Sequence, residues 1–471
     1  MTTSENPAVT GSAASRLPIK EKIGYGVGDT ASNLYFQTVM LYILFFYTDV
    51  FGLSAAAAGT MFLITRIWDA VNDPIMGMIA DRTETKWGKF RPYIVSMAPL
   101  LAISGVIAFI TPGFEAGGKL IYAYVTYTIL WMLYTAVNVP YSALMGVITP
   151  SSLERTEVSQ YRFVSMSIGQ LIVSAGTLYL VKFFGRGNEQ AGWSWTMGAF
   201  GLLAVILFAT TFFSTKERVH APKAGKADTK QDLKDLFKNK PWILIAIATV
   251  FQLIFAVMRG NSIPNFIKYY VHDQQLQLFT YTINLSIDGF ISSVNAAGSI
   301  FMIVGAILAK VFAKTLDKKN VYSGFLIAGA VISCGFYFLQ PHNVLLIFGL
   351  NVLVSFFMGA VSVLQWAIYT DTVDYGEWKF GRRATGLVMA ASLFALKLGL
   401  AFGGAFVGWI AEYYGFVANV EQTESALFGI RMLMSFYPAV FGIIGGLVMI
   451  SYPLKNKVML QIEKDLEARR Q

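Results

Sequence analysis

The stretch 61–92 constrains this chain most, because it is apolar enough to enter a lipid bilayer and yet carries several charged side chains. Arg66, Asp69 and Asp73 stand at positions i, i+3 and i+7, so a helix would place all three on one face. A carboxylate in the bilayer core costs roughly 2.5–3.5 kcal/mol even on lenient insertion scales. These side chains must therefore face a polar cavity or a partner.

Oxygen ligands gather at the end of this apolar run. Asp69 and Asp73 are accompanied by the amide of Asn72 and by Pro74, which has no N–H to offer the preceding helical turn and so frees a carbonyl oxygen. Such a set suits a small cation, and we predict a site for H⁺ or Na⁺ at Asp69 and Asp73. The alternative is a structural ion cluster with Arg66 that only ties helices together. It would leave one of the two carboxylates uncompensated.

The composition predicts a polytopic membrane protein. Of 471 residues, 55% are hydrophobic and only 14% charged, against roughly 25% charged in soluble proteins. About twelve apolar runs are long enough to span a bilayer. The polar stretch 270–290 is expected outside it. We predict an all-α fold of two six-helix bundles, with these segments: a disordered tail at 1–20, bundles at 21–214 and 242–456, a connector with a short surface helix at 215–241, and a tail at 457–471.

The distribution of Lys and Arg predicts the topology. Basic residues follow the even-numbered apolar runs and are nearly absent after the odd-numbered ones. By the positive-inside rule, both termini are expected in the cytoplasm. The same distribution accounts for the net charge of +9, so no nucleic-acid partner is expected.

Several classes of function are disfavoured. The single cysteine, Cys334, and three scattered histidines offer no set of ligands for a structural metal. No G-x-x-x-x-G-K-[S/T] loop for ATP is present, and no catalytic triad or pair of catalytic carboxylates lies outside the apolar runs. We predict that the protein is not an enzyme and needs no cofactor beyond a coupling ion.

Three motifs resemble one transporter family. They are RIWDAVNDPIMGMIADRTETKWGKFRP at 66–92, YTAVNVPYSAL at 134–144 and DTVDYGEWKFGRRATG at 371–386. Together they resemble the glycoside–pentoside–hexuronide:cation symporters of the major facilitator superfamily, and most nearly the bacterial xyloside carriers, over residues 20–457. The resemblance implies a monomeric, multi-pass protein of the bacterial inner membrane, surrounded by lipid. It would import a small-molecule sugar, with a xyloside or small oligosaccharide preferred, by alternating access.

The resemblance also assigns roles to residues near the paired carboxylates. In melibiose-type members the second-helix acids bind the cation with help from the fourth helix, which implies Asp69, Asn72, Asp73, Thr135 and Asn138 here. This chain departs from that pattern, because Asn138 and Asn33 stand where the melibiose carriers have acidic residues, and Ser142 stands where they have a Trp. Losing a carboxylate favours H⁺ over Na⁺, with Asp73 as the group protonated.

Other polar residues in apolar runs are candidates for sugar binding. Lys397 needs a carboxylate partner or a polar cavity. It either pairs with Asp69 or Asp73 across the two halves or donates to the sugar. Arg259 either contacts substrate or holds a helix bend near Pro264. Because sugars present apolar faces and hydroxyls, aromatic and amide side chains suit their binding. The predicted substrate-binding set is Asn33, Tyr134, Asn138, Arg162, Arg259, Trp366 and Lys397, with Tyr35, Tyr141 and Gln365 as further lining.

Opposite charges at the predicted cytoplasmic ends indicate a gate. Asp371, Asp374 and Glu377 in the second half would pair with Arg155 and Arg162 in the first. Each exposed pair is worth only about 0–1 kcal/mol, but a network can shift two states that differ by a few kcal/mol. The alternative is that these charges only orient the chain and keep its loops soluble.

Two kinds of alternative function remain open. The first is a glucuronide or hexuronide symporter, favoured if Arg259 and Lys397 both meet a substrate carboxylate, because Arg offers a bidentate fork. The second is a non-transporting membrane sensor or a lipid carrier on the same fold. A sensor predicts that Asp73→Asn leaves function unchanged.

Overall fold

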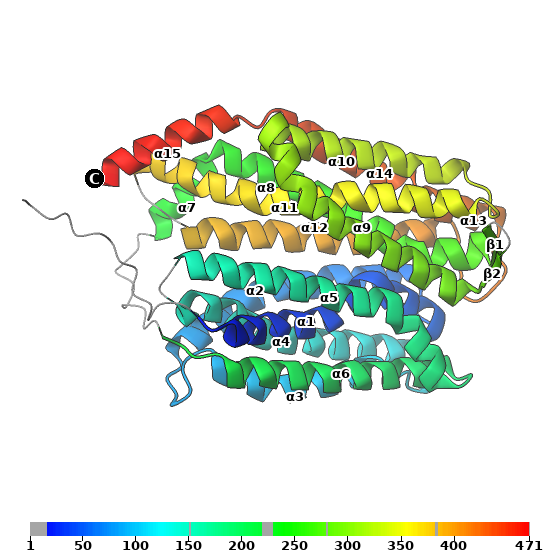
Figure 1. Cartoon of the computed structure of the whole chain (residues 1–471). Coiled ribbons are helices and arrows are strands. Elements are labelled where there is room, and N and C mark those ends of the chain that lie inside the picture. Colours follow the sequence, from blue (N-terminus) through cyan, green and yellow to red (C-terminus); the bar gives the residue numbers. More distant parts are fainter. Residues whose placement is uncertain (1–16, 150–151, 219–228, 279–280, 382–384, 471) are drawn as a thin grey trace, which may run out of the picture.

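A computed structural model describes residues 17–149, 152–218, 229–278, 281–381 and 385–470. Figure 1 shows two helical bundles whose long helices run roughly parallel. The N-terminal bundle consists of α1 (Ile19–Phe45), α2 (Ala55–Arg82), α3 (Arg91–Ala108), α4 (Ala116–Ile148), α5 (Ser152–Gly185) and α6 (Glu189–Ser214). The C-terminal bundle consists of α8 (Lys240–Phe266), α9 (Ile287–Leu316), α10 (Lys318–Cys334), α11 (Val344–Phe380), α12 (Thr385–Tyr413) and a broken helix, α13 (Glu424–Met434) plus α14 (Phe436–Ile450).

Three elements lie outside the bundles. The connector contains α7 (Thr229–Lys238), the short helix expected there, and the C-terminal segment forms α15 (Asn456–Arg470). An antiparallel hairpin of β1 (Gln274–Leu278) and β2 (Tyr281–Leu285) pairs Gln274 with Leu285. The all-α class is confirmed, and this hairpin is the addition to it. Its sequence alternates polar and apolar residues, which is a strand pattern inside a stretch expected only to be polar.

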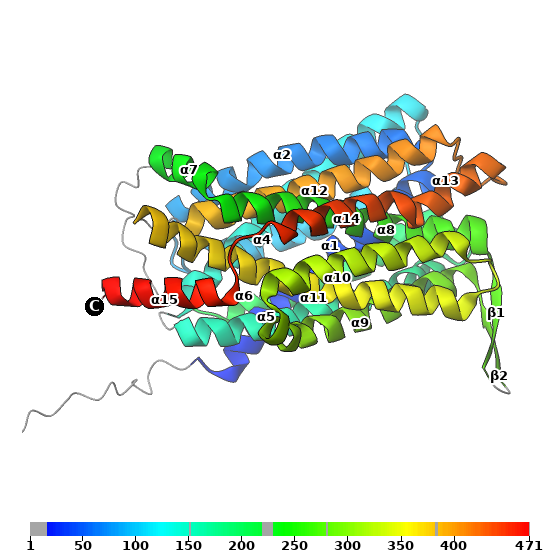
Figure 2. The ribbon, with the colours of Figure 1, turned by 90° about the horizontal axis from the view of Figure 1, so that it is seen from above.

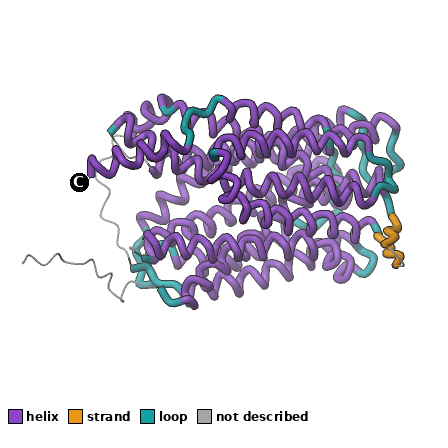
Figure 3. Tube along the Cα trace, turned by 45° about the horizontal axis from the view of Figure 1, so that its top comes forward, coloured by secondary structure: helices purple, strands orange, loops and turns teal. Residues whose placement is uncertain are grey.

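The two ends of the molecule are distinct. Figure 2 shows α7 and α15 at one end, here called the terminal face, and the β-hairpin at the other, here called the hairpin face. Figure 3 shows the strands, in orange, at the end opposite the C-terminus. In the described part of the chain, ten helices are long and apolar enough to cross a membrane. The two remaining long helices, α1 and α2, carry intramembrane charges, which lowers their hydropathy. The helices are thus consistent with about twelve spans.

Local signals set the bounds of α2, the helix that carries the paired carboxylates. Ser54 caps its start, because the Ser54 Oγ accepts a hydrogen bond from the Ala57 N–H at 3.2 Å. Pro74 lies inside the helix without ending it. Packing against neighbouring helices offsets the hydrogen bond that a proline removes.

Small residues let the bundles approach each other. The most extensive helix–helix contacts between the bundles are α2 against α12 and α5 against α9. A Cβ on Gly408 of α12 would overlap the carbonyl oxygen of Ala55 and lie 2.9 Å from the Cα of Gly59, both of α2. Glycine therefore permits this close crossing, as is common between membrane helices.

The apolar core is continuous across the bundles only in part. One cluster of buried residues fills the N-terminal bundle and continues into the hairpin-face portion of the C-terminal bundle, for example at Met258, Phe266 and Phe290. A second cluster, including Trp242 and Tyr322, fills the C-terminal bundle nearer the terminal face and extends to residues of α7 and α15, such as Leu236 and Ile462. Apolar packing therefore joins the bundles mainly on the hairpin side.

Candidate functional site

The two carboxylates of α2 meet a hydroxyl of α4 near the middle of the molecule. Thr135 Oγ1 lies 3.0 Å from Asp69 Oδ1 and 2.9 Å from Asp73 Oδ1, within hydrogen-bond distance of both. Asp69 and Thr135 are buried, and Asp73 is half-buried. One helical turn separates the acids, which places both carboxylates on the same side of α2 and within reach of one hydroxyl. The structure therefore brings together three of the five residues in the predicted cation set.

Two cations balance these carboxylates. Lys397 Nζ of α12 lies 3.0 Å from Asp69 Oδ2 and forms an ion pair with Asp73 as well. Arg66 Nη1 lies 3.6 Å from Asp69 Oδ2, and its guanidinium stacks 3.6 Å from the centre of the Trp131 ring. The cluster of Arg66, Asp69, Asp73 and Lys397 therefore sums to zero charge. The sequence left open whether Lys397 pairs with these acids, and with Arg66 alone one of them would be uncompensated.

Lys397 reaches the acids because α2 and α12 cross closely. The glycine contact at Gly59 and Gly408 holds the two helices together on the hairpin side of the cluster. Trp409 Nε1 also donates to Thr60 Oγ1 at 3.0 Å, and Glu412 Oε2 accepts from the Ala56 N–H at 3.1 Å. Of the two alternatives for Lys397, the structure has the charge pair between the halves.

The other two predicted cation ligands make different contacts. Asn138 Oδ1 accepts from Ser32 Oγ at 3.4 Å, and Asn138 Nδ2 donates to Tyr134 OH at 3.3 Å. These contacts connect Asn138 to α1 and to a predicted sugar-binding tyrosine. Asn72 is half-buried on α2. Neither amide is joined to the carboxylates by the hydrogen bonds of the described residues.

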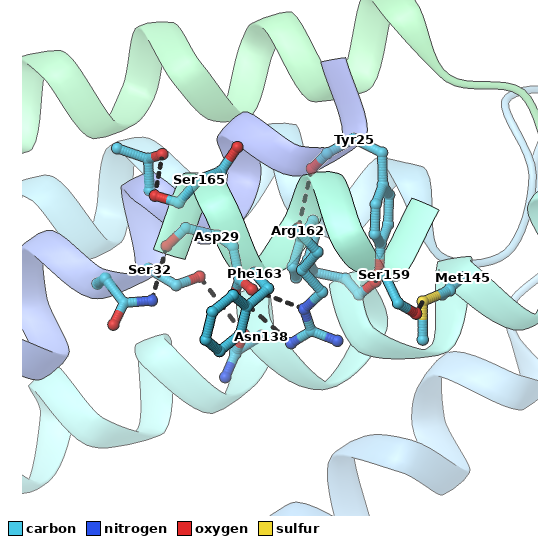
Figure 4. Close-up of polar contacts among 12 residues, drawn as sticks. Tyr25, Asp29, Ser32, Asn138, Met145, Ser159, Arg162, Phe163 and Ser165 are labelled. Atoms are coloured by element: carbon cyan, nitrogen blue, oxygen red, sulfur yellow. Dashed lines mark hydrogen bonds and ion pairs between the residues drawn. The ribbon is translucent and has the colours of Figure 1, made fainter. Parts of the chain in front are cut away.

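A second buried ion pair lies in the N-terminal bundle, between Asp29 of α1 and Arg162 of α5. Arg162 Nε lies 2.7 Å from Asp29 Oδ2, and Nη2 lies 3.5 Å from Oδ1 (Figure 4). The Asp29 side chain is 9% exposed and that of Arg162 is 27% exposed. The guanidinium thus keeps part of its surface open while one edge is held.

Aromatic rings support this pair. The Arg162 guanidinium lies 5.3 Å from the centre of the Tyr141 ring, and Tyr141 stacks on Tyr25 with ring centres 4.7 Å apart. Each of these tyrosines donates its hydroxyl to the carbonyl oxygen of the other, at 3.1 and 2.8 Å. The rings are therefore fixed, and they limit the orientations open to Arg162.

Asp29 was missed by the sequence analysis, although the sequence contained a signal for it. A carboxylate within an otherwise apolar helix is the same anomaly that identified Asp69. The comparison with melibiose-type carriers directed attention to Asn33, one turn further along. Asn33 instead donates its Nδ2 to the carbonyl oxygen of Asp29 at 2.9 Å and is buried.

The remaining predicted substrate residues are not joined to these two clusters. Arg259 is buried in the C-terminal bundle, where Nη2 donates to Asn351 Oδ1 at 3.4 Å and the guanidinium lies 5.2 Å from the Phe336 ring centre. Trp366 is 42% exposed and packs edge-on against Tyr369. The structure therefore does not gather all seven predicted residues into one contact set.

The predicted gate residues lie at the terminal face. Lys318 Nζ donates to both carboxylate oxygens of Asp371, at 2.8 and 2.7 Å, within the C-terminal bundle. Asp374 and Glu377 are half-buried on α11. Arg162 pairs with Asp29 within its own bundle, and the side chain of Arg155 lies outside the described residues.

The paired acids, a bridging hydroxyl and a cation from the other bundle can exchange a small cation. Their oxygens are hard ligands that accept H⁺ or Na⁺, and an entering cation would compete with Lys397 for Asp73. The Asp29–Arg162 pair with Asn138 offers donors and acceptors of the kind that bind sugar hydroxyls.

Comparisons with known proteins agree with this description. Residues 24–456 match the family model described as MFS/sugar transport protein. The chain is 36% identical over 436 residues to the inner membrane symporter YicJ of Escherichia coli (strain K12), covering 92% of this chain and 91% of that protein. It is 34% identical to the isoprimeverose transporter of Lactiplantibacillus pentosus, covering 96% and 92%.

A solved structure shows the same fold. The D-xylose-proton symporter superposes with a TM-score of 0.64 at 14% identity, covering 93% of this chain and 99% of that one. Because the family match spans nearly the whole chain and includes both clusters, the chain belongs to the MFS/sugar transport protein family and is a membrane transporter, not an enzyme.

Proposed function

We propose that this protein imports a glycoside, preferably a xyloside or other small oligosaccharide, together with H⁺ or Na⁺ by alternating access. The observation that carries the proposal is the ion pair of Lys397 with Asp69 and Asp73, because it joins the two bundles through the groups that would hold the cation. Similarity to a protein named as an isoprimeverose transporter supports a sugar as the substrate.

Lys397 acts as a tethered substitute for the coupling cation in the empty carrier. With Lys397 in place the four-residue cluster is neutral, and the buried carboxylates are compensated. When H⁺ protonates Asp73, or Na⁺ binds the acids and Thr135, the attraction between Asp73 and Lys397 falls. The released ammonium group is then free to donate to a sugar hydroxyl. Cation and sugar binding are coupled in this way, and by linkage each raises the affinity for the other by the same factor.

The sugar site extends from Lys397 into the N-terminal bundle. Arg162, Asn138 and Tyr134 supply its donors and acceptors. Asp29 is a positioning residue that holds the Arg162 guanidinium. Since Asp29 and Ser32 are three residues apart on α1, they hold Arg162 and Asn138 about one helical turn apart, roughly 4.5 Å along the helix axis. A pyranose spans such a distance with hydroxyls on successive carbons.

We further propose that both termini are cytoplasmic, so the terminal face is the inner face. Asp371, Asp374 and Glu377 on α11 and Arg155 on α5 then form the inner gate. In the described conformation Asp371 pairs with Lys318 of its own bundle. We propose that closing the inner face brings this acidic group together with basic residues of the N-terminal bundle.

One observation favours a second candidate, a glucuronide or hexuronide symporter. Arg259 is buried, its Nε has no hydrogen-bond partner, and among the described side chains no carboxylate pairs with it. A uronate carboxylate would compensate that charge. The sensor and lipid-carrier alternatives are not favoured by a comparable contact.

Transport by the purified protein in proteoliposomes tests these proposals together. Labelled xylosides, galactosides and glucuronides are each offered with a Na⁺ gradient and, separately, with a pH gradient. We expect concentrative xyloside uptake driven by the pH gradient. Stimulation by Na⁺ at constant pH would reverse the ion preference, and glucuronide uptake would favour the second candidate. Uptake of none of the sugars under either gradient would contradict sugar symport.

A further inference from the structure

A third polar cluster joins the two bundles at the hairpin face, and we call its four residues, Asp49, Lys268, Tyr269 and Asn419, the latch. Lys268 Nζ lies 2.7 Å from Asp49 Oδ1 and 2.7 Å from Asn419 Oδ1. Tyr269 donates its hydroxyl to the Asp49 carboxylate, and Asn419 Nδ2 donates to the Asp49 carbonyl oxygen. Asp49 belongs to the N-terminal bundle, and its three partners belong to the C-terminal bundle.

The latch is fully connected around a buried carboxylate, while Asn419 is exposed and the Lys268 side chain is 22% exposed. The Asp49 side chain is 0% exposed, and its second carboxylate oxygen accepts from Thr48 Oγ1 at 2.6 Å. The Asn419 N–H donates to Tyr269 OH at 2.9 Å, which completes a ring of contacts. A carboxylate buried in this way depends on its partners, since removing one leaves an uncompensated charge. The closed arrangement is therefore favoured only while Lys268 and Asp49 stay together.

The backbone is unusual at both sides of the contact. Asp49 lies in a π-helical turn, Phe46–Val50, that ends α1. Lys268 and Tyr269 lie in a matching π-helical turn, Ile267–Val271, that ends α8. These two helices are the first of their respective bundles. Such turns are rare and are frequent at functional sites, and here both occur at equivalent positions and meet in one ion pair.

An open depression lies beside Asp49 of the latch. A polar depression of about 470 Å³ on the hairpin face is lined by Asp49, Val50 and residues 187–190. Inward of the latch, the bundles meet through hydrogen bonds of Ser299 with Ser174 at 3.2 Å and of Gln170 with Ser299 at 3.4 Å. Asp49 therefore lines the depression and at the same time takes part in the contact that joins the two bundles.

We propose that the latch is the gate of the hairpin face: separating Asp49 from Lys268 opens a path from the depression toward the cluster of Asp69, Asp73 and Lys397. This inference rests on the proposed transport by alternating access. It adds the outer counterpart to the predicted inner gate. A purely structural contact would hold the bundles together without controlling access from the hairpin face. The two roles therefore differ in how readily a reagent outside reaches the interior.

Thiol labelling in intact cells tests the gate. The background is Cys334→Ser with Ser299→Cys, which puts a single thiol in the buried interface between the bundles. A membrane-impermeant maleimide is added outside. Asp49→Asn and Lys268→Gln are each expected to raise the labelling rate roughly tenfold or more, because they shift the population toward the open state. The exchanged pair Asp49→Lys with Lys268→Asp is expected to return the rate toward that of the background.

Two controls keep the result interpretable. Lys119→Gln removes a lysine at the same face whose Nζ donates to the Phe51 carbonyl oxygen within one bundle, at 3.1 Å, and it should leave labelling unchanged. Asn284→Cys, exposed on the hairpin, reports whether that face is outside. If it is not labelled, the proposed topology fails, and the same comparison in inside-out vesicles tests the latch by itself.

The outcomes separate the two proposals. Unchanged labelling in both latch variants, with the hairpin thiol accessible to the reagent, would overturn the gate even if sugar uptake persists. Increased labelling that the exchanged pair does not reverse would also count against it, because it would reflect general loosening of the fold. Increased labelling that is reversed supports the gate even if the transported solute is not a sugar.

Discussion

Lys397 of α12 and Asp73 of α2 form an ion pair across the boundary between the two bundles, with Asp69 3.0 Å from the same ammonium group. The pair makes the central cluster electrically neutral. Because Lys397 belongs to the other bundle, any change in the charge of Asp69 or Asp73 also changes the attraction between the two bundles. The first predictions follow from this coupling.

Replacing Lys397 by Gln removes the internal competitor for the carboxylates. We expect the apparent affinity for the coupling cation to rise, roughly tenfold, because the acids then lack their partner. Net uptake should fall, since the empty carrier would have to reorient with uncompensated charges. Exchange of external labelled sugar for sugar inside loaded vesicles should persist at saturating sugar, with a higher KM because a donor to the sugar is lost. Measuring exchange and net uptake side by side checks this, and equal losses in both would contradict it.

Replacing Asp73 by Asn is expected to abolish accumulation against a gradient while sugar still equilibrates. The amide keeps the shape of the side chain but can neither take up a proton nor carry charge. Accumulation in proteoliposomes is the measurement, and Glu115→Gln, at an exposed carboxylate before α4, is the matched control. If Asp69→Asn combined with Asp73→Asn retained full accumulation, the coupling scheme would be wrong.

Thr135 is expected to contribute through its hydroxyl alone. Thr135→Ala removes the oxygen shared by Asp69 and Asp73, a loss of about 1.5–3 kcal/mol for hydrogen bonds to charged groups, or roughly tenfold or more in cation affinity. Thr135→Ser should restore most of it. The cation concentration that gives half-maximal uptake at saturating sugar measures the effect. Equal behaviour of the Ala and Ser variants would exclude the hydroxyl as a ligand.

Asp29 is expected to affect the sugar and not the cation. Asp29→Asn weakens the contact that orients Arg162, so the KM for sugar should rise roughly tenfold with the cation dependence unchanged. Asp29→Glu should recover part of the loss. A purely structural role predicts instead that both variants lower the amount of folded protein and leave KM unchanged. Uptake kinetics combined with thermal melting distinguish the two.

The close crossing of α2 and α12 predicts that a larger side chain at Gly408 lowers the stability of the protein and disturbs the nearby ion pair. Gly408→Ala places a methyl group against the Ala55 carbonyl oxygen, and overpacking of this kind costs about 1–3 kcal/mol. We expect a lower melting temperature and weakened pairing of Lys397 with Asp73. Gly146→Ala on α4, where a Cβ would meet nothing within 4 Å, is the control and should melt like the parent.

The sequence by itself predicted the membrane class and the helical architecture, and it singled out Asp69 and Asp73 as a predicted cation site. These predictions follow from local properties: the length of apolar runs, the cost of a charge in lipid and the helical spacing of acidic residues. The family was predicted from the resemblance of three motifs, and the family match over residues 24–456 confirms it. The β-hairpin at 274–285 was missed, because a short polar segment outside the bilayer carries no comparable constraint.

Only the tertiary structure decided which charges meet. Lys397 lies 324 residues from Asp73, Arg162 lies 133 residues from Asp29, and Lys268 lies 219 residues from Asp49. A sequence shows that each of these buried charges needs a partner, but several candidates of the right sign exist. The crossing of α2 with α12, permitted by Gly59 and Gly408, and the meeting of the two π-helical turns select among them, because ion pairing depends on distances of a few ångströms that local sequence patterns do not encode.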